Sequence, residues 1–355
     1  MRFSTLSMTL SGALAAAVFI VALFPPTVRT PPVLPHILPA KRAVMLDNSL
    51  SGYVTINEGT DHIVAVSKFS REWATDGLLN RIYPDLERLP LTGNSAFPDP
   101  EQMLYLRADV IFAWRGPADF FKATGLPGLV ELWIDDSNPI QSRENVWREM
   151  GKAAGKDARV TALLERWAAK RAALKTALPQ DAARHVRAAW VHVYDGEWYT
   201  TSGDGFIAYK LELAGARNVM KRFKFGGKAD LEQLLIADPD VVLLGINPDD
   251  HTPTSQIADR PELRSLRAVR DHRIYRLPLH TYMNEPVEDL LLLTWMAEVF
   301  YPDIMPRTVR EEYREVYREV YCYPIGGDEI DRAIYLGENR CSAGYDRFVR
   351  KENGT

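Results

Sequence analysis

Two stretches of the chain, DPEQMLYLRADVIF at residues 99–112 and DLEQLLIADPDVVL at residues 230–243, align without a gap. Six of their fourteen positions are identical. Each copy begins with Asp, which caps helices well, and carries Glu in the first turn, where the helix dipole favours an acid. Each copy ends in an Asp-Val pair that opens an apolar run. The repeat therefore predicts a short helix leading into a buried strand, twice, and hence two similar lobes.

Short β-branched or aromatic runs alternate with helical patterns along the rest of the chain. We predict strands at residues 44–46, 63–66, 110–114 and 132–134 in the first half, and at 188–194, 241–246 and 274–277 in the second. Strands separated by helices predict an α/β fold with a mostly parallel sheet in each half. Two such lobes that face each other would enclose a ligand cleft.

One long amphipathic helix is predicted between the halves. Apolar residues from Val160 to Leu178 follow helical spacing until Pro179 ends the pattern, and a helix over 158–178 would be about 30 Å long. The predicted organisation is a signal or anchor segment with a proline-rich tether at 1–41, an N-terminal lobe at 42–156, a linking helix at 157–179, a C-terminal lobe at 180–302 and an extension at 303–355.

The N-terminus has the pattern of an export signal. Arg2 precedes twelve apolar residues at 13–24, and Pro25 and Pro26 follow. Twelve apolar residues suit the core of a signal peptide and are short for a span of about 30 Å of hydrocarbon. We therefore predict that the protein is exported. Cleavage of the segment and its retention as a membrane anchor both stay open.

Composition and charge exclude several classes of function. The 355 residues are 46% hydrophobic and 25% charged, which is typical of a globular chain long enough for two cores. With 43 Lys and Arg against 47 Asp and Glu, the net charge is −4, so the excess of positive charge that nucleic-acid binding uses is missing. Nucleic acid is not an expected partner.

The two cysteines, Cys322 and Cys341, are too few and too far apart for a thiolate metal site. In an exported chain, a disulfide between them would stabilise the C-terminal tail by roughly 3 kcal/mol. Two unpaired thiols are the alternative.

No motif of nucleophilic, phosphate-binding or zinc-dependent catalysis occurs in the sequence, and no two of the seven histidines are spaced three to five residues apart. We therefore predict no catalytic residues, no cofactor and no metal site made by the protein alone. An enzyme built on this fold would need a cluster of acid, base or metal-ligating groups.

Aromatic side chains occur where predicted strands end. Trp114 and Arg115 follow one strand, Trp198 and Tyr199 another, and His280 and Tyr282 a third. In open α/β sheets, ligands bind at the carboxyl ends of strands. A guanidinium beside an indole suits an anionic ligand or a metal chelate with flat faces. We predict that these six residues line the cleft, and packing beneath loops is the alternative for each.

The stretches 101–116, 213–219, 232–242 and 266–275, taken together, resemble the solute-binding proteins of ABC importers for iron complexes, haem or cobalamin. The resemblance extends over residues 42–302. It implies two Rossmann-like lobes joined by one rigid helix, in a monomeric periplasmic protein. Such a protein captures a metal chelate in the cleft and delivers it to an ABC transporter permease dimer.

The resemblance also implies roles for particular residues. Trp114 matches a cleft tryptophan of the cobalamin-binding members, and Tyr199 matches an aromatic residue of a loop in the second lobe. Glu101 and Glu232 match the glutamates with which each lobe docks onto arginines of the permease. Direct ligation of iron by Tyr282 or His280 stays open.

Two departures favour an iron chelate over cobalamin. Phe97 and Phe223 or Phe225 stand where cobalamin-binding members have further tryptophans, and the tail around residues 313–321 resembles the ending of iron-complex binders. The expected ligand is therefore a siderophore or haem. Cobalamin, another metal chelate, and an anchored ligand sensor with the same fold are the alternatives.

Overall fold

The structure is a computed structural model. It describes residues 38–46, 49–75, 78–93, 98–124, 128–132, 135, 137–194, 197–200, 208–221, 231–245, 253–278 and 287–350. The predicted export signal and most of the tether lie outside these residues. Within the described residues, every helix is too short or too polar to cross a membrane.

The first half of the chain forms a parallel sheet of four strands in the order β2-β1-β3-β4. The strands are β1 (Ala43–Met45), β2 (Ile63–Val66), β3 (Val110–Trp114) and β4 (Leu129–Leu132). The helices of this half are α2 (Leu50–Asn57), α3 (Lys68–Thr75), α4 (Leu79–Ile82), α5 (Pro100–Leu106), α6 (Arg115–Thr124) and α7 (Pro139–Ala154), with the short 3-10 helix η1 (Pro84–Arg88).

The second half forms a five-stranded sheet in the order β6-β5-β8-β9, with β7 also paired to β5. The strands are β5 (Arg187–Tyr194), β6 (Glu197–Thr200), β7 (Arg217–Asn218), β8 (Val241–Leu244) and β9 (Ile274–Arg276). All pairs are parallel except β5 with β6. The helices are α9 (Ala208–Leu213), α10 (Leu231–Ala237), α11 (Ser255–Ala258), α12 (Arg267–Arg270) and α13 (Val287–Phe300), with η2 (Ala182–Arg184) and η3 (Pro261–Leu263).

The α/β class and a mostly parallel sheet in each half are confirmed. Each of the seven predicted strands overlaps an observed one. The strand predicted at 132–134 overlaps β4 (Leu129–Leu132) at Leu132, and residues 133–134 lie outside the described residues. Two short strands, β6 and β7, were not predicted. Their few residues carry too little apolar pattern to be recognised without their partner β5.

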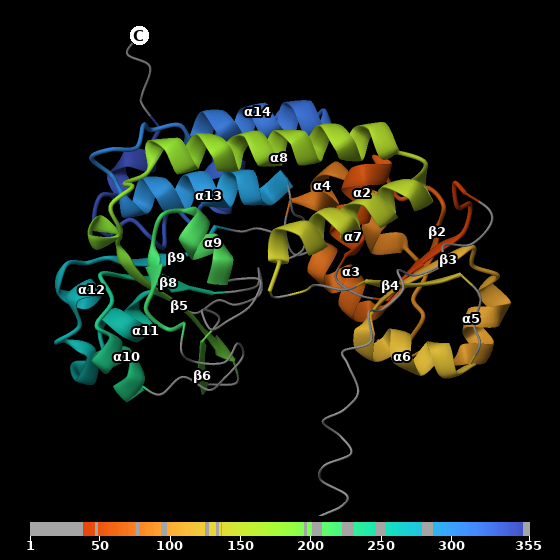
Figure 1. The fold of residues 1–355 in the computed structure, drawn as a ribbon, viewed down its shortest axis with the longest axis horizontal. Helices are drawn as coiled ribbons and strands as arrows, with labels where there is room; N and C mark the ends of the chain where they lie inside the picture. Colours follow the sequence, from red (N-terminus) through yellow and green to blue (C-terminus); the bar gives the residue numbers. More distant parts are fainter. Residues whose placement is uncertain are drawn as a thin grey trace, which may run out of the picture. The chain divides into compact units, whose positions relative to one another are not determined.

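The predicted linking helix is α8 (Asp157–Ala177). It contacts α7 of the first half and both α9 and α13 of the second. Its buried apolar residues include Val160, Leu163, Leu164, Trp167 and Leu174. Figure 1 shows α8 running beside α13 and α14. One helix therefore contributes apolar side chains to the packing of both halves.

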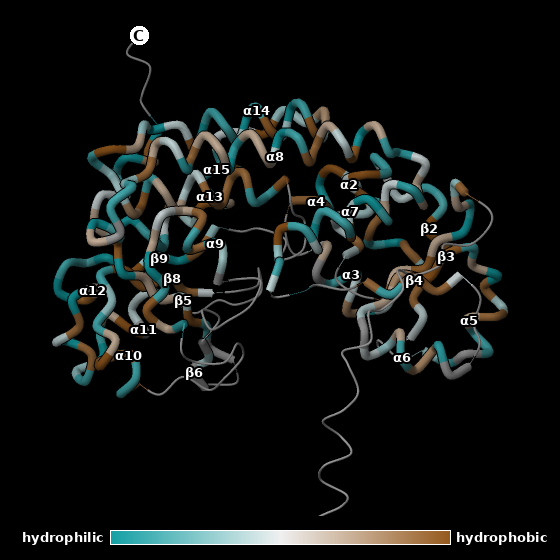
Figure 2. Tube along the Cα trace, in the orientation of Figure 1, coloured by the Kyte–Doolittle hydropathy of each residue, from teal (hydrophilic) through white to brown (hydrophobic). Residues whose placement is uncertain are grey.

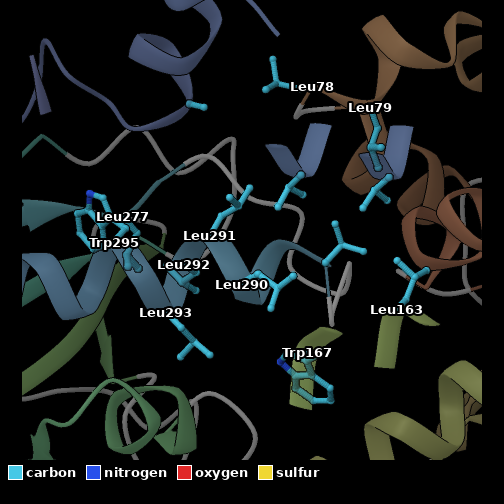
Figure 3. Packing of buried hydrophobic residues seen from close by; sticks show 14 of the residues in the cluster. Leu78, Leu79, Leu163, Trp167, Leu277, Leu290, Leu291, Leu292, Leu293 and Trp295 are labelled. Carbon is cyan, nitrogen blue, oxygen red and sulfur yellow. The ribbon is translucent and has the colours of Figure 1, made fainter. Parts of the chain in front are cut away.

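A continuous hydrophobic core occupies the helical layer around α8 and α13. It takes side chains from one face of each sheet, such as Phe112 of β3 and Leu243 of β8. All fourteen residues of α13 are buried, and Figure 2 shows most of this helix as hydrophobic. Figure 3 shows members of the core from α8, such as Trp167, and from α13, such as Leu290. The opposite face of each sheet has its own smaller core, under α5 and α6 in the first half and under the helices from α10 to α12 in the second.

The repeat found in the sequence is also a repeat of contacts. The carboxylate of Asp109 accepts the backbone N–H of Arg42 just before β1, at 3.0 Å, and that of Asp240 accepts the N–H of Arg187 at the start of β5, at 2.9 Å. In each half the same arginine donates its guanidinium to the last carbonyl of the repeat helix. The two Asp-Val pairs therefore fix the same helix-to-strand connection.

The C-terminal extension covers the outer edge of β9, the last strand of the second sheet. It contains α14 (Val309–Tyr321), α15 (Gly327–Ala333) and η4 (Tyr345–Phe348). The side chain of Asn339 accepts from the backbone N–H of Arg276 at 2.6 Å and donates to the Arg276 carbonyl at 2.8 Å. Ser342 donates to the carbonyl of Ile274, and the N–H of Ala343 donates to a carbonyl just before the strand. An open strand edge would offer these groups to other chains, so the extension completes the sheet.

A buried ion pair holds the end of the extension to α13. Arg347 lies 3.1 Å from Glu298, and both side chains are almost fully buried. Burial raises the pKa of Glu298, although the amides of Thr308 and Val309 and the charge of Arg347 favour its ionised form. Because those two amides open α14, the same carboxylate also caps that helix.

We expect Asn339→Ala to destabilise the protein by about 2–4 kcal/mol, because it removes three hydrogen bonds, two to Arg276 and one to Ile334, and leaves a buried N–H and a buried carbonyl of β9 unsatisfied. Urea unfolding followed by circular dichroism measures the difference. Arg340→Ala is the matched control, since Arg340 is exposed one residue away and should change stability by no more than about 0.5 kcal/mol. Equal stability of the two variants would contradict the role of Asn339.

Candidate functional site

Trp114 lies where the sequence predicts it, at the carboxyl end of a central strand. It is the last residue of β3, pairs in register with Leu132 of β4, and α6 begins at the next residue, Arg115. Its side chain is partly buried and packs against the main core. One part of the indole is therefore fixed by packing, while another part is exposed at the carboxyl end of the strand, where open α/β sheets bind ligands.

Trp198 and Tyr199 lie in a different place from the one expected. They belong to strand β6, which pairs antiparallel with β5, and not to a loop beyond the end of β5. The signal for this hairpin is the Asp195-Gly196 dipeptide between two apolar runs, because Asp-Gly favours the tight turns of two-residue hairpins. Tyr199 stands directly opposite His192, and their rings stack with centroids 5.4 Å apart.

The His192–Tyr199 stack lies on the face of the second sheet that bears the main core. Side chains alternate along β5, so His192 shares a face with Trp190, a member of that core. Trp190 donates its indole N–H to the carbonyl of Gly245, directly after β8, at 2.6 Å. The neighbouring strands β5 and β6 thus present aromatic rings on one face of the second sheet.

Arg276, which sequence analysis did not select, lies at the carboxyl end of the neighbouring parallel strand β9. It is the last residue of β9 and only 3% exposed. Its guanidinium lies 4.9 Å from the ring centre of Tyr335, and it is so near Gly245 that a β-carbon there would come within 2.9 Å of a guanidinium nitrogen. The available signal was an arginine inside the apolar run 274–277. Gly245, directly after β8, therefore contacts both Trp190 in the middle of β5 and Arg276 at the end of β9.

A buried ion pair joins helices α9 and α13 of the second half. Lys210 of α9 lies 2.7 Å from Asp289 of α13, and the two side chains are 6% and 2% exposed. Tyr209 donates a further hydrogen bond to Asp289 at 3.3 Å. Each helix begins directly after a segment outside the described residues, 201–207 and 279–286. The pair therefore ties together the helices to which two of the expected ligand-binding segments connect.

The other predicted site residues are placed as follows. His280 and Tyr282, like Phe97, Phe223 and Phe225, lie outside the described residues. Glu101 and Glu232 are exposed in the first turns of α5 and α10.

Cys322 and Cys341 are free and exposed in the structure, so the expected disulfide is not formed in it. Cys322 ends α14 with a left-handed backbone, whereas Cys341 lies among the turns between α15 and η4, so the two thiols belong to separate elements. Within the described residues, no three His, Cys, Asp or Glu side chains gather to hold a metal ion.

The sequence model of the periplasmic binding proteins matches residues 53–280 of this chain. The chain belongs to the periplasmic binding protein family. Members of this family bind small molecules in the periplasm and deliver them to ABC permeases, and they are not enzymes. No curated protein matches the chain.

Solved periplasmic binding proteins share the fold. A periplasmic solute-binding protein from Veillonella parvula superposes with a TM-score of 0.70 at 20% identity, over 85% of this chain and 93% of its own. The molybdate-binding protein MolA of Haemophilus influenzae gives 0.68 at 20% identity, over 84% and 96%. The haem-binding protein BhuT, solved with two haems, gives 0.57 at 20% identity, over 73% and 99%. At identities this low, the comparisons show the two-lobed fold alone. The ligand is therefore inferred from the residues of this chain.

We expect Lys210→Met to destabilise the protein by about 3–5 kcal/mol, because it leaves Asp289 as an uncompensated charge in the core. The double variant Lys210→Met/Asp289→Leu removes both charges and should regain most of the loss. Urea unfolding of the three proteins gives the comparison. A single variant as stable as the native chain would show that the pair does not hold α9 to α13.

Proposed function

We propose that this protein captures an iron chelate, a siderophore or haem, and delivers it to an ABC permease. The observation that supports the proposal is the occurrence of aromatic rings and a buried guanidinium at or near the carboxyl ends of parallel strands, where open α/β sheets bind ligands. In the first half this is Trp114, and in the second it is the His192–Tyr199 stack of β5 and β6 together with Arg276 at the end of β9. The lobes are proposed at residues 42–156 and 180–302.

Flat aromatic rings match the chemistry of such ligands. Haem and catecholate siderophores present large π-faces, against which indole, phenol and imidazole rings stack favourably. Trp114 and Tyr199 lie on separate sheets, so one ligand could be contacted from both. Trp198, His280 and Tyr282 are proposed to add further aromatic contacts from the same segments.

The charge of the site favours an anion. Arg276 supplies a permanent positive charge in a buried position, and guanidinium groups bind carboxylates through two parallel hydrogen bonds. Haem carries propionates, and many ferric siderophore complexes are anionic. We propose that Arg276 and Arg115 balance this charge.

A small oxyanion is the competing ligand, because MolA, with the same fold, binds molybdate. A tetrahedral oxyanion needs several convergent hydrogen-bond donors and gains little from aromatic faces. The second sheet instead presents the rings of His192 and Tyr199 and the guanidinium of Arg276, a combination that suits a larger ligand with flat faces.

Two further parts of the proposal concern export and docking. The segment 1–24 is proposed to direct export, with cleavage or anchoring both compatible with the tether. Glu101 and Glu232 are proposed to meet arginines of the permease. Their exposure on equivalent helices supports this role.

The ligand is tested by the absorbance spectrum and metal content of the protein purified from the periplasm of its native cells. We expect a visible absorption band, either of a ferric siderophore or of haem, with iron bound stoichiometrically. A colourless protein that contains molybdenum would contradict the chelate and favour the oxyanion. A corrinoid spectrum with cobalt would favour cobalamin.

We expect Trp114→Ala to weaken binding of haemin or a ferric catecholate by about 1–3 kcal/mol, because it removes an aromatic anchor. Titration of the ligand-free protein by fluorescence quenching measures the affinities. Phe120→Ala is the matched control, since Phe120 is a partly exposed aromatic residue on α6, beyond the strand end. Because Trp114 also packs against the core, urea unfolding of both variants is compared. Unchanged affinity for both probes would return Trp114 to a packing role.

A further inference from the structure

The two most exposed large apolar side chains of the described residues occupy equivalent positions of the repeat. Tyr105 on α5 is 87% exposed and Ile236 on α10 is 71% exposed. In the gapless alignment of the two copies, Tyr105 and Ile236 occupy the same position. The six other exposed large apolar side chains range from 40% to 59%.

Helices α5 and α10 also have equivalent buried residues and equivalent ends. Met103 and Leu234, which the alignment also pairs, are the buried anchors of the helices, at 1% and 2% exposure. The residues that end the helices, Arg107 and Asp238, both adopt positive φ, at 46° and 37°. The equivalence of Tyr105 and Ile236 therefore extends from the sequence to the backbone.

In each copy the exposed apolar residue lies four positions after an exposed glutamate. Glu101 and Tyr105 on α5, and Glu232 and Ile236 on α10, are thus neighbours on one helix face. On α5, Leu104 enlarges the apolar part with 59% exposure. Both lobes present the same combination of a negative charge and an apolar side chain one turn away.

Packing within the protein does not account for this arrangement. Exposed apolar residues are common singly, and one of them would need no explanation. Side chains as exposed as Tyr105 and Ile236 add little to the stability of their own lobe. The same feature in both copies, beside the same charged residue, instead fits a partner that has two equivalent contact sites.

We propose that Tyr105 and Ile236 are apolar anchors for docking onto the permease dimer, each inserting beside the contact that Glu101 or Glu232 makes with a basic side chain. The inference rests on the proposed delivery to a permease. The occupant is the periplasmic face of that dimer, where each of two equal halves offers a basic group with an apolar pocket beside it. Charge attracts and orients the partners, and burial of the apolar side chain slows their dissociation.

The test measures binding of the full chain, loaded with haemin or a ferric siderophore, to its permease dimer in lipid nanodiscs. Tyr105→Ser/Ile236→Ser is compared with Ile304→Ser/Val349→Ser, which alters two exposed apolar residues outside the repeat. We expect the first double variant to bind about tenfold more weakly or worse, mainly through faster dissociation. The control should bind like the native chain. Affinity for the loading probe should be unchanged in both.

Several outcomes would overturn the proposal. One is equal docking by the two double variants. Another is equal binding of the native chain to nanodiscs without permease, which would make the surface a lipid contact. A third is a concentration-dependent dimer of the native chain that the Tyr105→Ser/Ile236→Ser change abolishes, which would make it a self-contact. If the native chain docks but binds neither probe, the chelate proposal fails while the docking proposal is still tested with ligand-free protein.

Discussion

Burial of α13 on every side is the constraint on which the rest of the structure depends. This helix contacts α8, α9 and α14, and its side chains join a core that reaches one face of each sheet. A helix without a polar face cannot be exposed, so the linking helix and the C-terminal extension must both cover it. The carboxylates along it are then acceptable only with partners, as Asp289 has in Lys210 and Glu298 has in Arg347.

Local patterns in the sequence were enough to predict the two helix-to-strand repeats and the long linking helix. The Asp-Val pairs at Asp109 and Asp240 predicted two equivalent helix-to-strand connections, and the structure shows the same hydrogen bonds at both. Helical spacing from Val160 to Leu178 predicted α8 to within one residue at each end. These features depend on residues close in sequence or on exact repetition, which a single sequence displays.

The parts that were missed depend on contacts between distant segments. Tyr199 was expected in a loop because the Asp-Gly sequence at 195–196 was not recognised as a hairpin signal, and the pairing of β6 with β5 places its ring against His192. Arg276 looked like an interruption of an apolar strand, and its surroundings come from Gly245 and Tyr335. No local pattern indicates that a charge will be accommodated by residues from two other segments.

The C-terminal extension combines local and distant contacts, because it completes a sheet and also surrounds Arg276 at the end of β9. Asn339 binds both backbone groups of Arg276, far from it in the sequence, and Tyr335 of the same segment lies beside the Arg276 guanidinium. Covering the edge of β9 prevents strand addition, and the same contacts fix the end of the strand from which Arg276 extends. Arg347 in turn anchors the extension to Glu298 of α13. The segment that holds Arg276 in place is therefore itself anchored to the buried helix α13.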